Sequence, residues 1–205
     1  MSDKKEIKVV LVGESQTGKT SLLNCFKGEQ FDENTKSTLG ASCYNLELEY
    51  KKKPMVFQVW DTAGDEKYHS INRYFYKDAS VVIIVYDITN PLSFDCIKDY
   101  WIDEIKNKTN TNPVCLIVAN KSDLFADEAV PEKDSRDFAE KHNAMFFSIS
   151  CKDGSGIKEL INGMASSYVS RSQDIKSDNG NEKSIVIDNK SFIRGNNKKK
   201  SKCCE

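Results

Sequence analysis

The sequence predicts an α/β fold, a doubly wound and mostly parallel sheet with helices on both of its faces. Two observations indicate this fold class. Short β-branched runs alternate along the chain with segments of helical periodicity. Two of these runs, residues 81–87 (VVIIVYD) and 114–120 (VCLIVAN), are almost continuously apolar, as strands covered on both faces are. Ligands of such folds bind beyond the carboxyl ends of the strands, so the loops that follow the strands are the first candidates for a site.

The individual elements follow from local patterns. Residues 7–12 form a strand, and residues 19–27 form a helix with Leu22, Leu23 and Phe26 on one face. Residues 42–50 and 55–61 alternate and are joined by Lys51-Lys52-Lys53-Pro54, which predicts a hairpin at an exposed edge. The other strands are expected at residues 81–87, 114–120 and 146–150, and the other helices at 91–108, 131–143 and 156–171. The prediction is a six-stranded sheet with one antiparallel edge strand and about five helices.

The charge is nearly balanced, with 30 Lys and Arg against 31 Asp and Glu in 205 residues. An ordinary nucleic-acid binder has a clear basic excess, so nucleic acid is not an expected partner. The apolar run near the N-terminus is too short for a secretory signal, and the longest aliphatic stretch, residues 81–85, is too short to span a bilayer. We expect a cytoplasmic protein that touches a membrane only at its C-terminal end.

The composition changes at about residue 171. From Ser172 onward Ser, Asp, Asn, Lys and Gly dominate, and no apolar periodicity remains. Residues 1–170 carry a net charge of −5, whereas residues 171–205 carry one of +4. We therefore expect one folded domain at residues 1–170, followed by a disordered tail at residues 171–205.

The loop after the first strand, GESQTGKT at residues 13–20, fits the pattern GxxxxGK[ST] of a P-loop. Its glycines let the backbone N–H groups surround phosphates, and the helix that begins there adds the positive end of its dipole. In this pattern Lys19 reaches the terminal phosphates and the Thr20 hydroxyl binds Mg²⁺. The predicted phosphate-binding residues are Gly13, Glu14, Ser15, Gln16, Thr17, Gly18, Lys19 and Thr20.

A P-loop alone does not distinguish an ATPase, a kinase and a GTPase. The tetrapeptide Asn120-Lys121-Ser122-Asp123 lies at the end of a predicted buried strand and does distinguish them. The Asp123 carboxylate accepts hydrogen bonds from the ring N–H and the exocyclic amine of guanine, and adenine offers no such pair of donors. Leaving a buried carboxylate unpaired rejects the wrong base by orders of magnitude. The tetrapeptide therefore predicts a guanine nucleotide.

Two further residues are candidates for Mg²⁺. In Trp60-Asp61-Thr62-Ala63-Gly64, Asp61 ends a predicted strand and binds the ion through water, while the Gly64 N–H senses the γ-phosphate. Thr38, in the polar segment after the first helix, supplies its hydroxyl to the same ion. Taken alone, Thr38 is more often a plain loop residue.

Together these motifs resemble those of the small GTPases of the Ras superfamily, and most closely the Rab family. The similarity covers residues 7–168, with GESQTGKT, Thr38-Leu39-Gly40, WDTAG, NKSD and Ser150-Cys151-Lys152 in the family's order. It implies a P-loop GTPase domain that binds GTP or GDP with Mg²⁺, with Thr38 on the ion only in the GTP state. The segments around Thr38 and after Gly64 would be switches that order around the γ-phosphate. The resemblance also assigns nucleotide contacts to Ser21, to Phe31 against the guanine ring, and to Ser150, Cys151 and Lys152, where the family has Ser-Ala-Lys.

The resemblance also implies partners and a location. The partners are an exchange factor, a GTPase-activating protein, a GDP-dissociation inhibitor, a prenylation escort protein, and effectors that bind the switches in the GTP state. The protein would be a monomer on the cytoplasmic face of endomembrane vesicles or organelles, with a cytosolic pool, and would direct vesicle traffic.

The chain departs from the family where hydrolysis takes place. The resemblance assigns catalysis to Lys19, Gly64 and the residue after DTAG, which is Asp65 instead of the usual Gln that orients the attacking water. A carboxylate repels the triphosphate and donates no hydrogen bond, so slow intrinsic hydrolysis is expected, although Rab-type activating proteins supply a glutamine of their own. Gln16 also replaces a usual glycine of the P-loop.

Two interpretations therefore stay open, a cycling GTPase switch and a hydrolysis-impaired, predominantly GTP-bound module that binds effectors. A P-loop kinase is a remote third, because NKSD argues against it. Residues 39–43 (LGASC) depart from the Ile-Gly-Val-Asp-Phe of most Rab proteins, which leaves the subfamily and its effectors open.

The end of the tail predicts a lipid anchor. Adjacent cysteines, Cys203 and Cys204, stand one residue before the end, and a polybasic patch precedes them, made of Arg194, Lys198, Lys199, Lys200 and Lys202. Stable membrane attachment needs two such signals. The arrangement is not a CaaX box, because Lys202 is the fourth residue from the end. It resembles the twin cysteines that are prenylated in Rab proteins.

Overall fold

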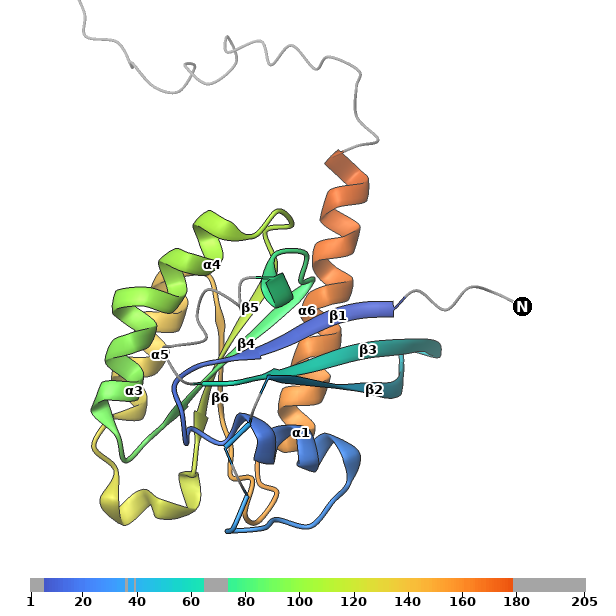
Figure 1. Ribbon diagram of the computed structural model, residues 1–205. Coiled ribbons are helices and arrows are strands. Elements are labelled where there is room, and N and C mark those ends of the chain that lie inside the picture. Colours follow the sequence, from blue (N-terminus) through green and yellow to red (C-terminus); the bar gives the residue numbers. More distant parts are fainter. Residues whose placement is uncertain (1–5, 36, 39, 65–73, 179–205) are drawn as a thin grey trace, which may run out of the picture.

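The computed structural model describes residues 6–35, 37–38, 40–64 and 74–178. Its strands are β1 (Glu6–Val12), β2 (Ala41–Tyr50), β3 (Lys53–Thr62), β4 (Val81–Asp87), β5 (Val114–Asn120) and β6 (Met145–Ser148). They form one six-stranded sheet in the order β2-β3-β1-β4-β5-β6 (Figure 1). β2 and β3 pair antiparallel, and every other pair in the sheet is parallel. The predicted mostly parallel sheet with one antiparallel edge strand is confirmed.

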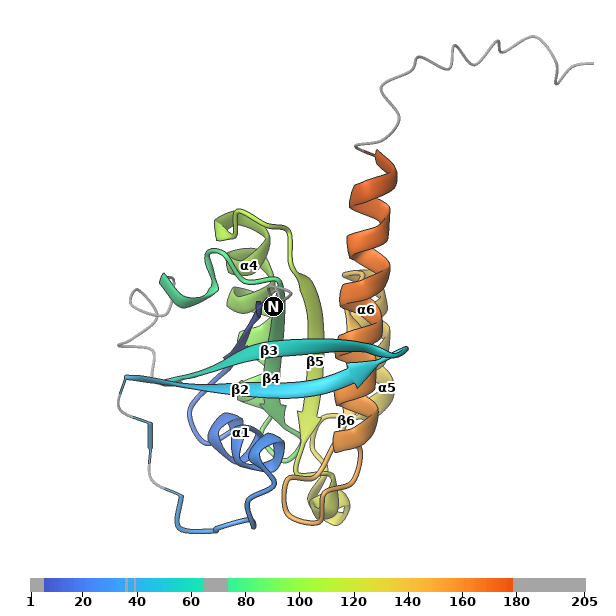
Figure 2. The same ribbon diagram turned by 90° about the vertical axis from the view of Figure 1, so that its right-hand side faces the viewer.

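Helices cover both faces of this sheet. One face carries α1 (Lys19–Lys27) and α6 (Ile157–Asp178), and the other carries α3 (Pro91–Cys96), α4 (Ile102–Lys108) and α5 (Glu132–Lys141) (Figures 1 and 2). A short 3₁₀ helix, Ser122–Asp127, follows β5. The doubly wound arrangement predicted from the alternating pattern is confirmed.

The two faces of the sheet carry separate apolar cores. In β1, Val9 and Leu11 pack against the α1 and α6 side, whereas Val10 and Val12 pack against the α3 and α5 side. β4 lies between β1 and β5, and all seven of its residues are buried. A strand covered on both faces removes every side chain from water, which is why β4 has no polar alternation.

Several element boundaries differ from the prediction. The helix predicted at residues 91–108 is continuous, but it contains a π-helical turn at Ile97–Trp101 between α3 and α4. Pro131 precedes α5 as its N-cap, and β6 begins one residue earlier and ends two residues earlier than predicted. The shifts at the element ends are one or two residues, which is the usual variation of helix and strand boundaries.

α6 extends to Asp178, so the expectation of a tail without regular structure is wrong for residues 172–178. The polar composition of these residues was misleading, because no Gly or Pro interrupts the chain between Gly163 and Gly180 and an established helix propagates at little cost. The helix is anchored by Leu160 and Met164 in the core and by Tyr168, whose ring meets Phe57 edge-on at 6.2 Å. Among the described residues, no helix combines the length and apolarity needed to cross a membrane.

Candidate nucleotide-binding site

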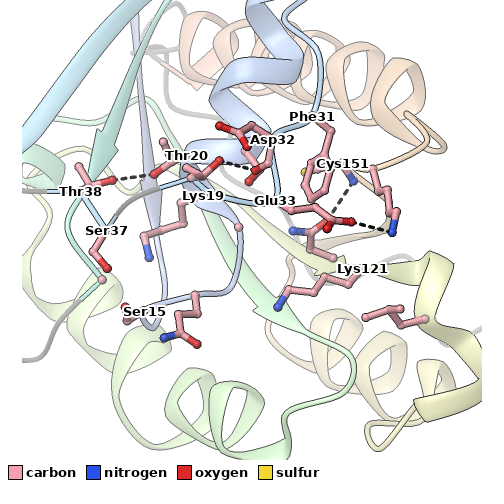
Figure 3. Close-up of a pocket in the computed structure, with 18 of the residues that line it drawn as sticks. Ser15, Lys19, Thr20, Phe31, Asp32, Glu33, Ser37, Thr38, Lys121 and Cys151 are labelled. Atoms are coloured by element: carbon pink, nitrogen blue, oxygen red, sulfur yellow. Dashed lines mark hydrogen bonds and ion pairs between the residues drawn. The ribbon is translucent and has the colours of Figure 1, made fainter.

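A pocket of about 480 Å³ lies at the carboxyl ends of the parallel strands. The P-loop after β1 forms its floor, and the ends of β3 and β5, the loop after β6 and the segment after α1 complete it (Figure 3). The predicted residues that line it are Ser15, Gln16, Gly18, Lys19, Thr20, Ser21, Phe31, Thr38, Gly64, Asn120, Lys121, Asp123, Cys151 and Lys152. Motifs separated by more than a hundred residues in sequence thus meet in one cavity.

Two glycines of the P-loop cannot carry a side chain. Gly13 has φ +132°, and a Cβ there would lie 2.2 Å from the carbonyl oxygen of Val85 on β4. Gly18 has φ +92°, and a Cβ there would lie 2.2 Å from Nδ2 of Asn120. The loop is therefore held tightly between β4 and the end of β5.

The side chain of Lys19 lies inside the P-loop. It is 5% exposed, and its Nζ donates to the carbonyl oxygens of Gly13, at 2.8 Å, and Glu14, at 2.7 Å. Burial lowers its pKa to about 8, although the nearby carboxylates of Asp61 and Glu14 act in the opposite direction. Gly64 approaches so closely that a Cβ there would lie 2.2 Å from Nζ. The ammonium group is thus fixed between the carbonyls of the P-loop and Gly64.

Three oxygen-bearing side chains converge beside this lysine. The Thr20 hydroxyl donates to Asp61 Oδ2 at 2.8 Å, the Thr38 hydroxyl donates to the same oxygen at 3.2 Å, and the two hydroxyls are 2.6 Å apart (Figure 3 shows the last contact). Asp61 is fully buried, which raises the pKa of its carboxyl. Its other oxygen, Oδ1, is buried and has no hydrogen-bond partner among the described residues. Hard hydroxyl and carboxylate oxygens with an unsatisfied acceptor among them fit a Mg²⁺ ion.

Asn120 connects the opposite end of the pocket to the P-loop. Its Nδ2 donates to the Thr17 carbonyl at 2.8 Å, and its Oδ1 accepts from the backbone N–H of Cys151 at 3.3 Å. Thr17 is itself buried and donates its hydroxyl to the Glu14 carbonyl at 2.9 Å. One amide at the end of β5 therefore joins the loops that follow β1 and β6.

A hydrogen bond from Ser150 orients the carboxylate of Asp123. The Ser150 hydroxyl donates to Asp123 Oδ1 at 2.6 Å and accepts from the backbone N–H groups of Lys152, at 3.1 Å, and Asp153, at 3.3 Å. Ser150 is fully buried and stands outside the pocket lining. The predicted residues Gly13, Glu14, Thr17, Asp61 and Ser150 thus support the pocket from its second layer.

Six lining residues were missed by the sequence, namely Asp32, Glu33, Thr35, Ser37, Thr62 and Leu124. Glu33 forms an ion pair with another lining residue, Lys152, with 3.1 Å between Oε1 and Nζ (Figure 3). The polar run between Phe31 and Thr38 was the available signal, since Asp32 begins a turn by accepting from the Asn34 N–H at 2.9 Å. Asp87 was also not predicted as part of the site, and its carboxylate pairs with Nζ of Lys121.

Of the predicted site residues, Asp65, Cys203 and Cys204 lie outside the described residues.

Comparisons with known proteins agree with these motifs. The family model described as "Ras family" matches residues 8–170. Ras-related protein RABF2b of Arabidopsis thaliana is 36% identical over 154 residues, which cover 75% of this chain and 76% of the relative. Ras-related protein Rab5A of Oryza sativa subsp. japonica is 34% identical over 161 residues, which cover 78% of this chain and 79% of the relative. Ras-related protein Rab-31 of Rattus norvegicus is 34% identical over 200 residues, which cover 98% of each chain. The chain therefore belongs to the Rab family of small GTPases in the Ras superfamily.

Proposed function

We propose that this Rab-family protein binds GTP and GDP with Mg²⁺ in the pocket, hydrolyses GTP to GDP and phosphate, and acts as a switch in vesicle and membrane traffic. The observation that carries the proposal is the placement of Asp123 and Lys19 in the lining of one cavity, a carboxylate for the base and an ammonium group for the phosphates. A pocket of about 480 Å³ has a volume suited to a small-molecule ligand.

The phosphate end is built from backbone and charge. The N–H groups of the P-loop and the first turn of α1 face the phosphates, and Lys19 neutralises their negative charge. Thr20 and Thr38 would hold Mg²⁺ through their hydroxyls and Asp61 through water, and the ion, when bound, would offset charge on the β- and γ-phosphates. Thr38 comes from the segment after α1, so its engagement distinguishes the GTP state from the GDP state.

The guanine end is built from hydrogen bonds and apolar contact. Asp123 accepts from the ring N–H and the exocyclic amine, and the hydroxyl of Ser150 fixes its orientation. Phe31, which is 38% exposed and lines the pocket, covers one face of the base. The aliphatic stems of Lys121 and Lys152 line the same end.

The nucleotide content of the freshly purified full-length protein tests this function. We expect guanine nucleotide in near-stoichiometric amount, measured by chromatography of the denatured supernatant. A preparation that contains mostly GDP favours the cycling switch, and one that contains mostly GTP favours the hydrolysis-impaired module. Bound adenine nucleotide, or failure to take up GDP after EDTA treatment, would contradict the proposal.

Changing Asp65 to Gln is expected to speed intrinsic hydrolysis at least about tenfold, because an amide orients the attacking water and does not repel the γ-phosphate. The measurement is single-turnover hydrolysis of preloaded GTP by the wild type and Asp65→Gln. GDP release serves as the control and is expected to be equal in both proteins. Equal hydrolysis rates would show that Asp65 does not limit the reaction.

Removing residues 203–205 is expected to move the protein from the membrane fraction to the cytosol. Two prenyl chains supply most of the membrane affinity, and each basic residue of the tail adds about 1 kcal/mol at an anionic surface. Fractionation of cells that express tagged protein measures the distribution. Changing Lys198, Lys199, Lys200 and Lys202 to Gln with the cysteines intact is the matched control and should cause only partial release. Unchanged membrane association after truncation would rule out prenylation as the anchor.

The expected partners differ between the GTP-bound and GDP-bound forms of the protein. Effectors and a GTPase-activating protein would bind the switch segments in the GTP form, whereas a GDP-dissociation inhibitor and a prenylation escort protein would bind the GDP form and the tail. An exchange factor would open the pocket at the Mg²⁺ side. This cycle places the protein on the cytoplasmic face of endomembranes, with a cytosolic pool.

A further inference from the structure

Two cysteines from distant parts of the chain meet beside the base end of the pocket. The Cys25 thiol, on α1, donates to the backbone carbonyl of Cys151, with 3.5 Å between Sγ and O, so the two cysteines are in direct contact. Cys151 is 5% exposed and lines the pocket, whereas Cys25 is partly exposed and does not line it. The pair is isolated from Cys96 and Cys115, which pack on the opposite face of the sheet.

We propose that Cys25 and Cys151 are a redox modification site, and that their oxidation to a disulfide by a hydroperoxide accelerates release of the bound guanine nucleotide. The inference rests on the proposed nucleotide binding. The oxidant acts on the partly exposed Cys25, and the buried Cys151 completes the bond.

The two thiols are suited to different steps. Hydrogen bonding from the Cys151 thiol lowers the pKa of Cys25, whereas the same contact and burial raise the pKa of Cys151. The Cys25 thiolate therefore attacks the peroxide, the O–O bond breaks, and Cys25 becomes a sulfenic acid while an alcohol or water leaves. The Cys151 sulfur then attacks that of Cys25, an S–S bond forms and water leaves. Two thiols and one hydroperoxide thus give one disulfide, one water and one alcohol, or a second water.

The bond changes the geometry of the base end. A disulfide requires the sulfurs to approach to about 2.05 Å, well inside hydrogen-bond contact. Leu22, Leu23 and Phe26 anchor α1 in the same core that contains Cys151, so closing the bond moves the loop that carries Cys151 as well as α1. That movement pulls the Cys151 N–H, already 3.3 Å from Asn120 Oδ1, away from its acceptor. It also shifts the adjacent Ser150, whose hydroxyl orients Asp123.

The test uses the full-length protein with Cys203 and Cys204 changed to Ser, loaded with a fluorescent GDP analogue. After treatment with hydrogen peroxide, we expect a Cys25–Cys151 cross-linked peptide by mass spectrometry under non-reducing conditions. GDP release should become about tenfold faster, as the loss of one hydrogen bond to a charged group predicts, and dithiothreitol should restore the original rate. Cys25→Ser should release GDP at the untreated rate with and without peroxide, and the matched control Cys96→Ser should respond as the parent does.

Three results would overturn the proposal. They are the absence of the cross-link, a cross-link that leaves the release rate within twofold, and an equal response to peroxide in Cys25→Ser. Failure of the reduced protein to bind the GDP analogue would instead contradict the proposed nucleotide binding, because cross-link detection does not require a ligand.

Discussion

Replacing Lys19 by Met is expected to weaken binding of GTP and GDP by about 10²–10⁴-fold. Methionine fills a similar volume, but it removes an ammonium group that is fixed by the Gly13 and Glu14 carbonyls at the phosphate end of the pocket. Two charge-assisted hydrogen bonds to phosphate are worth about 3–6 kcal/mol, which corresponds to that range of affinity. Equilibrium titration with fluorescent nucleotides measures the loss.

The pH dependence of binding gives this substitution a second readout. Burial lowers the pKa of Lys19 to about 8 in the protein without ligand, and anionic phosphates raise it again in the complex. Binding therefore takes up a proton above pH 8, and the wild-type affinity should fall by up to about tenfold between pH 8 and 9, where the guanine ring N–H is still protonated. Lys19→Met should show no such slope in this window. A similar slope in both proteins would assign the titration to another group.

The sequence was most informative about the parts of the site that local geometry determines. A strand, a glycine loop and a helix in direct succession place Lys19 and Thr20 without reference to the rest of the chain. The tetrapeptide that contains Asn120 and Asp123 likewise follows its strand directly. The sheet was predictable for a related reason. A nearly continuous apolar run such as residues 81–87 indicates by its composition alone a strand that is buried on both faces.

Contacts between distant segments were not predictable in this way. The ion pair between Glu33 and Lys152 and the contact between Cys25 and Cys151 join residues 119 and 126 positions apart. They depend on which helix lies next to which loop, and periodicity contains no such information. The length of α6 has a local cause, because no Gly or Pro interrupts the chain after Gly163 until Gly180, and the polar composition of residues 172–178 does not reveal it.

The structure also changes how the roles of the predicted residues are understood. Ser150 and Asn120 were expected to contact the nucleotide, and both are buried, with Asn120 bound to Thr17 of the P-loop. A change at the base end therefore reaches the phosphate end through a single amide side chain. This connection is the physical reason to expect that an event at Cys151 alters the release of the whole nucleotide.

Changing Asp123 to Asn is expected to reverse the base preference. The wild-type carboxylate offers two acceptors to guanine, whereas an asparagine offers one acceptor and one N–H₂ donor. The Ser150 hydroxyl, 2.6 Å from Oδ1, continues to donate to the oxygen that remains, so the N–H₂ group takes the other position and faces the exocyclic amine of guanine. Two donors then oppose each other, and GDP affinity should fall by about 10²–10⁴-fold.

Xanthosine diphosphate distinguishes lost recognition from a damaged fold. Xanthine carries a carbonyl oxygen where guanine carries its amine, so it accepts from the new N–H₂ group, and Asp123→Asn should bind it more tightly than GDP. Ser150→Ala is the matched control, because it loosens the orientation of the carboxylate but keeps both acceptors, and it should cost only about tenfold in GDP affinity. If Asp123→Asn retained GDP within tenfold of the wild type, Asp123 would not be the residue that reads the base. If it bound neither nucleotide while unfolding at the wild-type temperature, the carboxylate would instead be needed to hold the loop after β5 in place.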